Sequence, residues 1–224
     1  MTVSRREWLA RTAAGGAALA LEMAWLRQAL AADAVKKGVA QVRGEATVGG
    51  RPAKPGMEVK PDDVVTTGRD GQLVFVVGRD AFLARANARV ELSGTAGRAA
   101  INGLKIVTGA LLSVFEPGGG RRIQTTTATI GIRGTGIYVE VEKMRTYACT
   151  CYGEAELTPV DDPKEAETVR TTHHDQPRYI YAKGMPRMIR MIEAAPVINH
   201  TDAELTLLES LVGRKVPFDS RRYP

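Results

Sequence analysis

Between residues 39 and 157, apolar residues occur in short runs that are rich in β-branched and large aliphatic side chains. The clearest runs are residues 72–77, 88–92, 104–107 and 111–115, and residues 137–142 alternate at a period of two. Runs of this length and composition predict β-strands. Turn-forming Gly, Pro, Asn and Asp residues separate them, and no helical segment lies between them. The pattern therefore predicts an all-β fold: a short-stranded β-sandwich, a barrel or a solenoid-like stack.

The dense strand pattern ends at residue 158, and the period changes to that of a helix only in the tail. A polar stretch over residues 159–200 contains two further strand-like pieces, residues 167–171 and 178–181. Thr201 and Glu204 then have the spacing of a capping box, which predicts the start of a helix. The helix would carry its apolar residues on one face, namely Leu205, Leu208, Leu211 and Val212, and would end at Gly213. We expect this amphipathic helix to pack on the β domain, and docking of a partner is the alternative use of its apolar face.

The first 34 residues predict a leader for export. Ser4, Arg5, Arg6 and Leu9 match the twin-arginine signal, which a receptor reads as an address. The apolar run over residues 12–21 is shorter than the roughly 20 residues that span a bilayer. Small residues then provide cleavage sites after about Ala31 or Ala34. We expect a Tat-exported bacterial protein that is periplasmic or secreted, with no transmembrane span after cleavage.

Charge narrows the class of partner. The net charge is +6 and the sequence pI is about 9.5, but the basic residues are spread along the chain and the densest runs are pairs. This distribution favours a solvated surface of mixed charge over a specific polyanion partner. Aromatic residues make up 5% of the chain, which argues against a stacking platform for single-stranded nucleic acid. We expect no nucleic-acid partner.

Several segments, in order, resemble the FecR domain. The resemblance begins with residues 44–56 and with Pro61–Gly68, continues through residues 71–75 and 86–92, and ends with residues 153–157. Its most specific part is residues 126–138, which are similar to the family's Gly-Val-Arg-Gly-Thr hallmark. Together these motifs cover about 115 residues. The organisation expected is a signal peptide over residues 1–34, a FecR-like domain over 39–158, a β extension and loop over 159–200, and a helix and tail over 201–224.

The hallmark residues are Gly131, Arg133, Gly134 and Thr135. Glycines at this density predict a bulge or a sharp bend between two strands, because glycine adopts backbone angles closed to other residues. At such a bend the planar fork of Arg133 can donate to exposed carbonyls and clamp the backbone. A ligand-binding role for Arg133 is the alternative.

The resemblance implies a role in sensing or signalling across a cell envelope. Members of the family that regulate transcription join a cytoplasmic anti-sigma segment to an exported domain, whereas only the leader precedes the domain in this sequence. The expected function is therefore a non-catalytic binding, scaffold or sensing module whose partner is an envelope protein or a cell-wall component. The sequence does not indicate an oligomeric state.

The resemblance leaves Cys149, Cys151, His173 and His174 unexplained. Residues i and i+2 of a strand point to one face, so the two thiols project together, while a disulfide between them would be strained. Two thiols and imidazoles suit zinc or copper, with Asp175 as a further ligand or as a hydrogen-bond acceptor. Adjacent histidines in a strand point to opposite faces, so only one joins such a site unless the chain bends. A buried thiol pair, or a disulfide formed after export, are the alternatives, and no cofactor is required.

No common catalytic motif is present. The sequence has no His-Glu-x-x-His pattern, nucleophile elbow or phosphate loop. A thiol-dependent enzyme built on Cys149 or Cys151 with His173 is the third candidate. The last histidine, His200, lies just before the predicted helix and is expected at the surface or beside the cap. We expect no enzyme activity.

Overall fold

The structure is a computed structural model that describes residues 37–94, 101–118, 120–186 and 190–219. The chain divides into a unit of residues 1–34 and a unit of residues 35–224. The predicted leader, its arginine pair and its cleavage sites lie outside the described residues. All described residues belong to the second unit.

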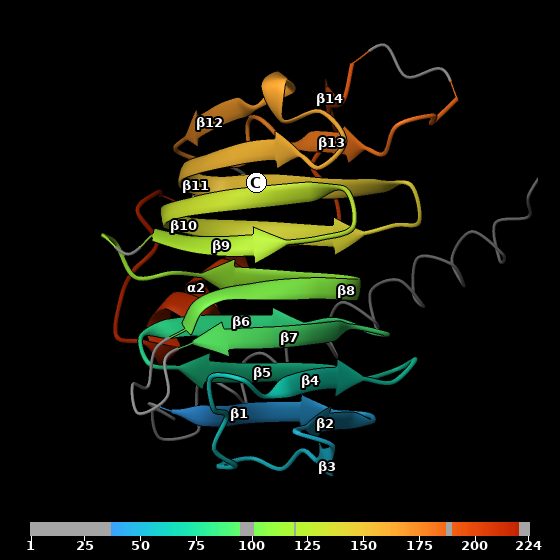
Figure 1. Cartoon of the computed structure of the whole chain (residues 1–224). Helices are drawn as coiled ribbons and strands as arrows, with labels where there is room; N and C mark the ends of the chain where they lie inside the picture. Colours follow the sequence, from blue (N-terminus) through green and yellow to red (C-terminus); the bar gives the residue numbers. More distant parts are fainter. Residues whose placement is uncertain (1–36, 95–100, 119, 187–189, 220–224) are drawn as a thin grey trace, which may run out of the picture. The chain divides into compact units, whose positions relative to one another are not determined.

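This unit is an all-β structure with one α-helix near its end, as the sequence predicts (Figure 1). The first strands are β1 (Gly38–Arg43), β2 (Ala46–Val48), β3 (Arg51–Pro52), β4 (Val64–Thr67), β5 (Gln72–Val77), β6 (Asp80–Ala84) and β7 (Arg89–Gly94). They are followed by β8 (Ile101–Val114), β9 (Gly120–Gln124), β10 (Ala128–Val141), β11 (Arg145–Pro159), β12 (Glu167–Thr171), β13 (Arg178–Tyr181) and β14 (Ile192–Ala194). A 3₁₀ turn covers Pro163–Glu165, and helix α2 covers Asp202–Leu211.

The sheet has two halves, and three long strands, β8, β10 and β11, run through both of them. In one half, the first parts of β8 and β10 and the last part of β11 pair with β7, β9 and β12, and β10 also pairs with β11. In the other half, the remaining parts of the three strands pair with β6, with one another and with β13. Side chains from both halves form one buried cluster, for example Val90 and Ile130 from one half and Phe75 and Val139 from the other. The sheet is therefore folded over at β8, β10 and β11, and its two halves enclose a common core.

The bends lie inside these strands, not between separate ones. The runs predicted over residues 104–107 and 111–115 belong to the single strand β8, and the glycine-rich hallmark lies in the middle of β10, where the pairing with β11 shifts register between Arg133 and Gly136. Gly134 has φ +62° and Gly153, on the neighbouring β11, has φ +90°. A Cβ atom on Gly153 would lie 2.6 Å from the carbonyl oxygen of Gly134. Glycine lets both strands turn while the hydrogen-bonded ladder continues.

The segments after residue 158 belong to the same sheet. The predicted strands 167–171 and 178–181 are β12 and β13, and both pair with β11 in antiparallel register. Each pairs with a different part of it: β12 with residues 153–157 and β13 with residues 145–148. Four residues of β11, from Cys149 to Tyr152, therefore lie between the two partners. This arrangement positions the candidate site.

Helix α2 begins with the predicted capping box. The Thr201 side chain accepts a hydrogen bond from the backbone N–H of Glu204, and the Glu204 side chain accepts one from the backbone N–H of Thr201. Leu205, Leu207 and Leu208 are fully buried, and the helix packs against β6 and β8. The expectation that this helix packs on the β domain is confirmed.

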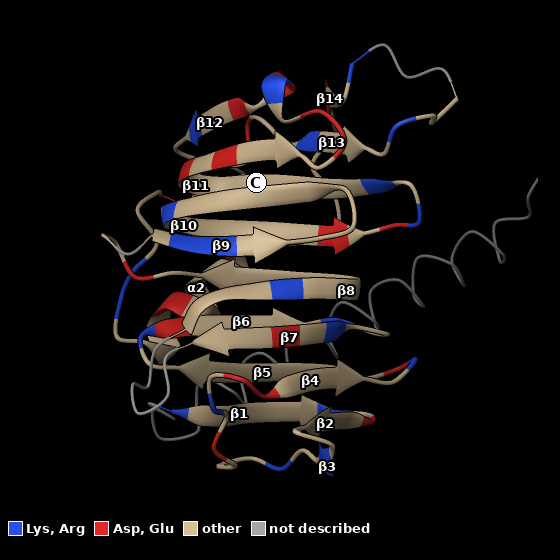
Figure 2. Ribbon diagram, in the orientation of Figure 1, with Lys and Arg blue, Asp and Glu red and all other residues tan. Residues whose placement is uncertain are grey.

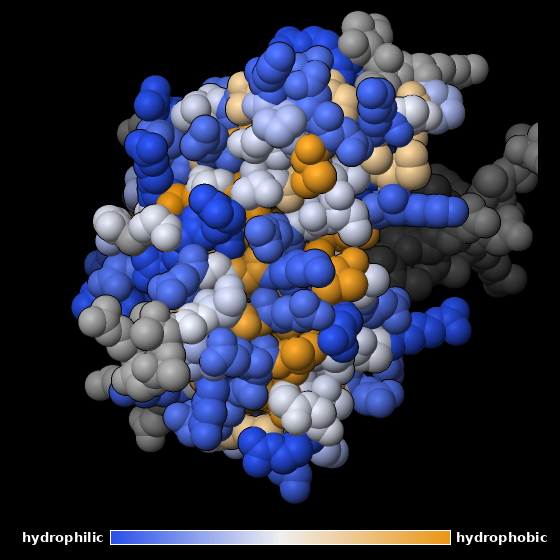
Figure 3. All heavy atoms as spheres, in the orientation of Figure 1, coloured by the Kyte–Doolittle hydropathy of each residue, from blue (hydrophilic) through white to orange (hydrophobic). Residues whose placement is uncertain are grey.

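The exposed face combines both signs of charge. Figure 2 shows Lys and Arg interspersed with Asp and Glu along the strands, and the blue segment on β9 carries Arg121 and Arg122. In Figure 3 hydrophilic side chains cover most of this face, and hydrophobic ones form small separate areas. No helix in the described ranges combines the length and the apolarity that crossing a membrane requires.

Candidate metal centre

Cys149 and Cys151 lie in the part of β11 between the pairing regions of β12 and β13. Both thiols are free and fully buried. Cys149 pairs with Tyr138 of β10, and the Cys151 thiol donates to the carbonyl oxygen of Cys149 at 3.5 Å. Because the two residues are i and i+2 of one strand, their sulfur atoms lie on the same face and point into one group of side chains.

The loop over residues 172–177 brings a histidine to this group. The loop connects β12 to β13 and crosses the free edge of β11, where the backbone N–H of His174 donates to the carbonyl oxygen of Cys151 at 3.1 Å. His174 has φ +39°, so the chain turns sharply at this residue. Its side chain is buried, and its Nδ1 atom lies 3.8 Å from the Cys149 sulfur.

The second histidine of the group is His200, immediately before helix α2. It is buried, 8% exposed, and its ring stacks on Tyr138 with a centroid distance of 4.8 Å. Its Nδ1 atom lies 2.6 Å from the carbonyl oxygen of Ile198. Of the two positions expected for His200, the one beside the helix cap at Thr201 is confirmed and the surface position is wrong. The helix cap at Thr201 holds the preceding residue against the sheet, and a single sequence does not show which part of the sheet the helix start will reach.

Four donor atoms converge in this group, which consists of Cys149, Cys151, His174 and His200. All of them lie within 4.8 Å of one another, and His174 Nδ1 is 2.8 Å from His200 Nε2. A tetrahedral zinc ion with ordinary bond lengths separates two nitrogen ligands by about 3.3 Å, and a sulfur from a nitrogen by about 3.6 Å. The observed sulfur–nitrogen spacing of 3.8 Å is close to the second value, whereas the nitrogen–nitrogen spacing of 2.8 Å is shorter than the first, so the two imidazoles would move apart when zinc binds.

The outer nitrogens of both imidazoles face oxygen acceptors. His174 Nε2 lies 2.9 Å from a carboxylate oxygen of Asp202, and His200 Nδ1 faces a carbonyl. Neither oxygen has a proton to give, so each outer nitrogen must carry the hydrogen. In neutral rings, the inner nitrogens His174 Nδ1 and His200 Nε2 then present lone pairs to each other at 2.8 Å. Two lone pairs at this distance repel unless a cation lies between them, either a proton or a metal ion.

His173 lies outside the cysteine group. Its Nε2 atom contacts both carboxylate oxygens of Asp202, at 2.9 and 3.0 Å, so that His173, His174 and Asp202 form a second group. Of the two adjacent histidines, only His174 joins the cysteine group, and His200 occupies the place that the sequence-based set gave to His173. Asp202 has the orienting role considered for Asp175, whose carboxylate instead accepts from the Thr171 hydroxyl.

Burial and mutual contacts shift the pKa values of the two thiols in opposite directions. A hydrogen bond from Cys151 lowers the pKa of Cys149, and contacts with His174 and His200 lower it further against the opposing effect of burial. Burial raises the pKa of Cys151 well above its usual value. Burial lowers the pKa of His174, but its contacts with Cys149 and Asp202 outweigh this, and the pKa is raised overall. These contacts therefore favour ionisation of Cys149 over ionisation of Cys151.

The hallmark residues lie at the bend of β10, in neither of these groups. Arg133 is exposed and forms an ion pair with Glu154 of β11 at 3.4 Å. The Thr135 hydroxyl donates to the carbonyl oxygen of Glu154 at 2.8 Å and accepts from its backbone N–H at 3.1 Å. Gly131 lies opposite Glu156 in the ladder, and Gly134 makes the turn itself. In the structure, Thr135 is thus the hallmark side chain that bonds to backbone.

Comparisons with known proteins add little to this geometry. No protein-family model and no curated protein matches the sequence. Two crystal structures of a proposed anti-sigma factor from Parabacteroides distasonis ATCC 8503 are similar to the chain, each with a TM-score of 0.44 and 9% sequence identity. The similarity covers 54% of this chain and 55% or 56% of the other, so it spans about half of each protein. Similarity at this level does not identify a family.

Proposed function

We propose that this chain is a non-catalytic metal-binding module of a bacterial envelope, with one Zn²⁺ held by Cys149, Cys151, His174 and His200. The observation that carries the proposal is the convergence of two sulfur and two imidazole nitrogen atoms in one buried group. Two thiolates and two imidazoles in a tetrahedral set favour zinc over metals that prefer oxygen or planar coordination.

The hydrogen bonds around the imidazoles support this assignment. Histidine ligands in metal sites usually donate their other ring N–H to a carboxylate or a backbone carbonyl, which sets the tautomer and the ring orientation. Here Asp202 and the carbonyl of Ile198 are these acceptors. The Cys151 proton would leave when the metal binds, because a coordinating thiol is deprotonated.

The enclosure of the group supports a structural or sensing role and argues against catalysis. Catalytic zinc sites keep a position open for water or substrate, whereas structural sites are closed by four protein ligands. Both cysteines are fully buried, His174 and His200 are buried, and the ring of Phe218 packs against His173 at a centroid distance of 4.6 Å. Among the described residues, all four donor side chains are thus enclosed, unlike those of an open catalytic site.

The metal would connect three segments that are distant in the sequence: strand β11, the loop between β12 and β13, and the start of helix α2. His174 is 25 residues from Cys149, and His200 is a further 26 residues away. Metal binding therefore stabilises the packing of the helix and the loop on the sheet. The presence of the metal would then be read by an envelope partner as a change in this surface.

The envelope location and the FecR-domain assignment rest on the sequence alone. The Arg5-Arg6 pair with its apolar run supports export, and the ordered motifs from Gly44 to Leu157 support the family. Export through the twin-arginine route carries folded proteins, so a metal acquired before export would remain in place. An envelope protein or a cell-wall component remains the proposed partner.

The test is elemental analysis of protein exported to the periplasm and purified without added metal, combined with thiol titration of the same sample. We expect about one zinc per chain, lost in the Cys149→Ser/Cys151→Ser double variant and reduced in His200→Asn, which keeps three of the four donors. Val139→Ala is the matched control, because it truncates a buried side chain on the adjacent strand and leaves every donor in place. One copper per chain in place of zinc would support the proposed site and identify copper, not zinc, as its metal. Metal-free protein with two titratable thiols that takes up neither ion would overturn the proposal.

A further inference from the structure

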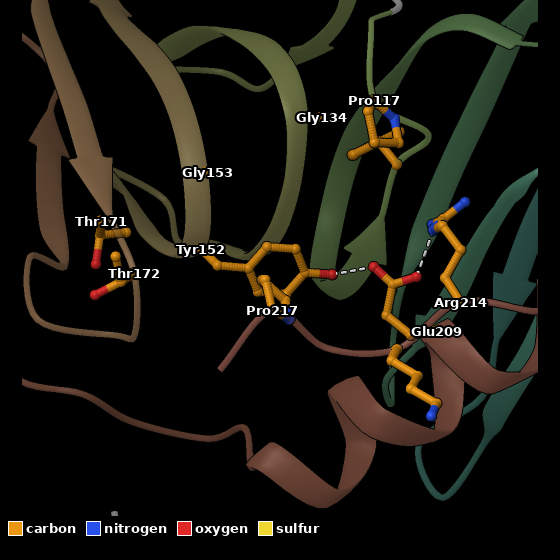
Figure 4. Close-up of a pocket in the computed structure, with 11 residues that line it drawn as sticks. Pro117, Gly134, Tyr152, Gly153, Thr171, Thr172, Glu209, Arg214 and Pro217 are labelled. Carbon is orange, nitrogen blue, oxygen red and sulfur yellow. Dashed lines mark hydrogen bonds and ion pairs between the residues drawn. The ribbon is translucent and has the colours of Figure 1, made fainter. Parts of the chain in front are cut away.

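A second feature of the molecule is a cavity of about 350 Å³ at the bends of β10 and β11 (Figure 4). One side is formed by Gly134, Tyr152 and Gly153, and another by the segment that follows helix α2, including Arg214 and Pro217. Thr171 and Thr172, at the end of β12, close a third side. A volume of this size is at the lower end of the range for sites that bind small molecules.

The cavity results from the bends themselves. Gly134 and Gly153 carry no side chain at the point where both strands turn, and their positive φ angles exclude most other residues. The walls beside them are rigid and mostly apolar, since Pro117 packs on Gly134 and the Tyr152 ring is held by the hydrogen bond from its hydroxyl to Glu209. The shape therefore exists before any ligand binds, which lowers the cost of binding.

The side chains that line this cavity carry more positive than negative charge, because Arg214 and Lys215 are basic and Glu209 is acidic. Glu209 is 3% exposed and has both carboxylate oxygens engaged, one by the Tyr152 hydroxyl and the other by Nε of Arg214 at 2.5 Å. Arg214 is thus neutralised, although its Nη2 atom is buried without a hydrogen-bond partner. Lys215 is exposed and carries the other positive charge of the lining residues. An anionic group at the rim would meet Lys215, while the acid below it is already paired.

We infer that this cavity binds a small organic anion with an apolar, ring-sized body: the body lies between Pro117, Tyr152 and Pro217, and the anionic group lies near Lys215. The inference does not depend on a bound metal, because none of the four proposed zinc ligands lines the cavity. It assigns the chain a ligand site in addition to the proposed metal site.

The test uses two probes of the same shape and different charge. Calorimetric titration at low salt should show one 2-naphthoate bound per chain, about fivefold more tightly than the neutral 2-naphthamide, which is the upper range for an exposed ion pair. Lys215→Met should lower the affinity for 2-naphthoate to that of 2-naphthamide and leave the amide unchanged. Thr172→Trp should abolish binding of both probes by filling the cavity.

Val160→Trp is the matched control for the tryptophan, because Val160 is 51% exposed and lies outside the cavity. Its affinity for both probes should equal that of the unmodified chain. Absence of binding by both probes would overturn the inference, and so would binding that Thr172→Trp leaves unchanged. Equal affinity for acid and amide would overturn the anionic part of the assignment. Metal content measured on the same samples separates these outcomes from a failure of the zinc proposal.

Discussion

The Nδ1 atom of His174 lies 2.8 Å from the Nε2 atom of His200, although 26 residues separate the two histidines in the sequence. Each ring turns its other nitrogen to an oxygen acceptor, so the two inner nitrogens face each other beside the thiol of Cys149. This relationship is the centre of the proposed metal site. It also makes the start of helix α2 and the β12–β13 loop interdependent.

Replacement of Asp202 by asparagine should weaken metal binding without abolishing it. The carboxylate accepts hydrogen bonds from both His173 and His174, and loss of such a partner typically lowers metal affinity about 10- to 100-fold. Competition with a chromophoric zinc chelator measures the change. Asp175→Asn is the matched control, because Asp175 bonds to Thr171 and not to an imidazole. Equal zinc affinity in Asp202→Asn and the unmodified chain would contradict the orienting role.

Removal of metal should lower the stability of the whole described unit. A ligand that binds only the folded state adds about 4 kcal/mol to the free energy of unfolding at a free concentration 1,000-fold above its Kd. Thermal unfolding with zinc and after chelation measures this difference. The Cys149→Ser/Cys151→Ser variant should melt at the same temperature in both conditions. If chelation leaves the melting temperature of the unmodified chain unchanged, the metal does not connect the three segments.

Thr201→Ala should affect both the helix and the metal site. Loss of the cap costs about 1 kcal/mol of the free energy of unfolding, because a backbone N–H of the first turn loses its acceptor. Since Thr201 lies between His200 and Asp202, zinc affinity should fall as well. Thr206→Ala is the control on the same helix, since its hydroxyl is exposed and bonds to the carbonyl of Asp202 within the helix. Zinc affinity equal in the two variants would show that the cap does not position the site.

Gly153→Ala should destabilise the fold at the bend. The residue has φ +90°, and a Cβ atom would lie 2.6 Å from the carbonyl oxygen of Gly134. Strain of this kind costs on the order of 1–3 kcal/mol. Gly120→Ala on β9 is the control, because its Cβ atom would meet nothing within 4 Å. Urea unfolding of both variants measures the difference, and equal midpoints would contradict the bend assignment.

The sequence was most informative where the determining interactions are local. Alternation and turn residues predicted the strands 167–171 and 178–181, and the spacing of Thr201 and Glu204 predicted the start of α2. The glycine-rich hallmark predicted a bend. It did not show that β10 continues through the bend, because continuity depends on pairing with β8 and β11, which are distant in the sequence.

The metal site could be predicted only in part for the same reason. The i, i+2 spacing of Cys149 and Cys151 indicated a shared face, which the structure confirms. His200 was expected at the surface or beside the cap because no spacing rule connects it with the cysteines, and only the packing of α2 brings it to β11. The left-handed backbone of His174 likewise removes the alternation expected for two adjacent histidines, so that both imidazoles reach Asp202.

X-ray absorption at the zinc edge of the metal-loaded protein tests the central claim most directly. The proposed site predicts two sulfur ligands at about 2.3 Å and two imidazole nitrogens at about 2.0–2.1 Å. In His200→Asn one nitrogen contribution should disappear while both sulfur ligands remain. A zinc shell made of oxygen and nitrogen alone, without sulfur, would contradict the account and place any bound zinc elsewhere on the chain.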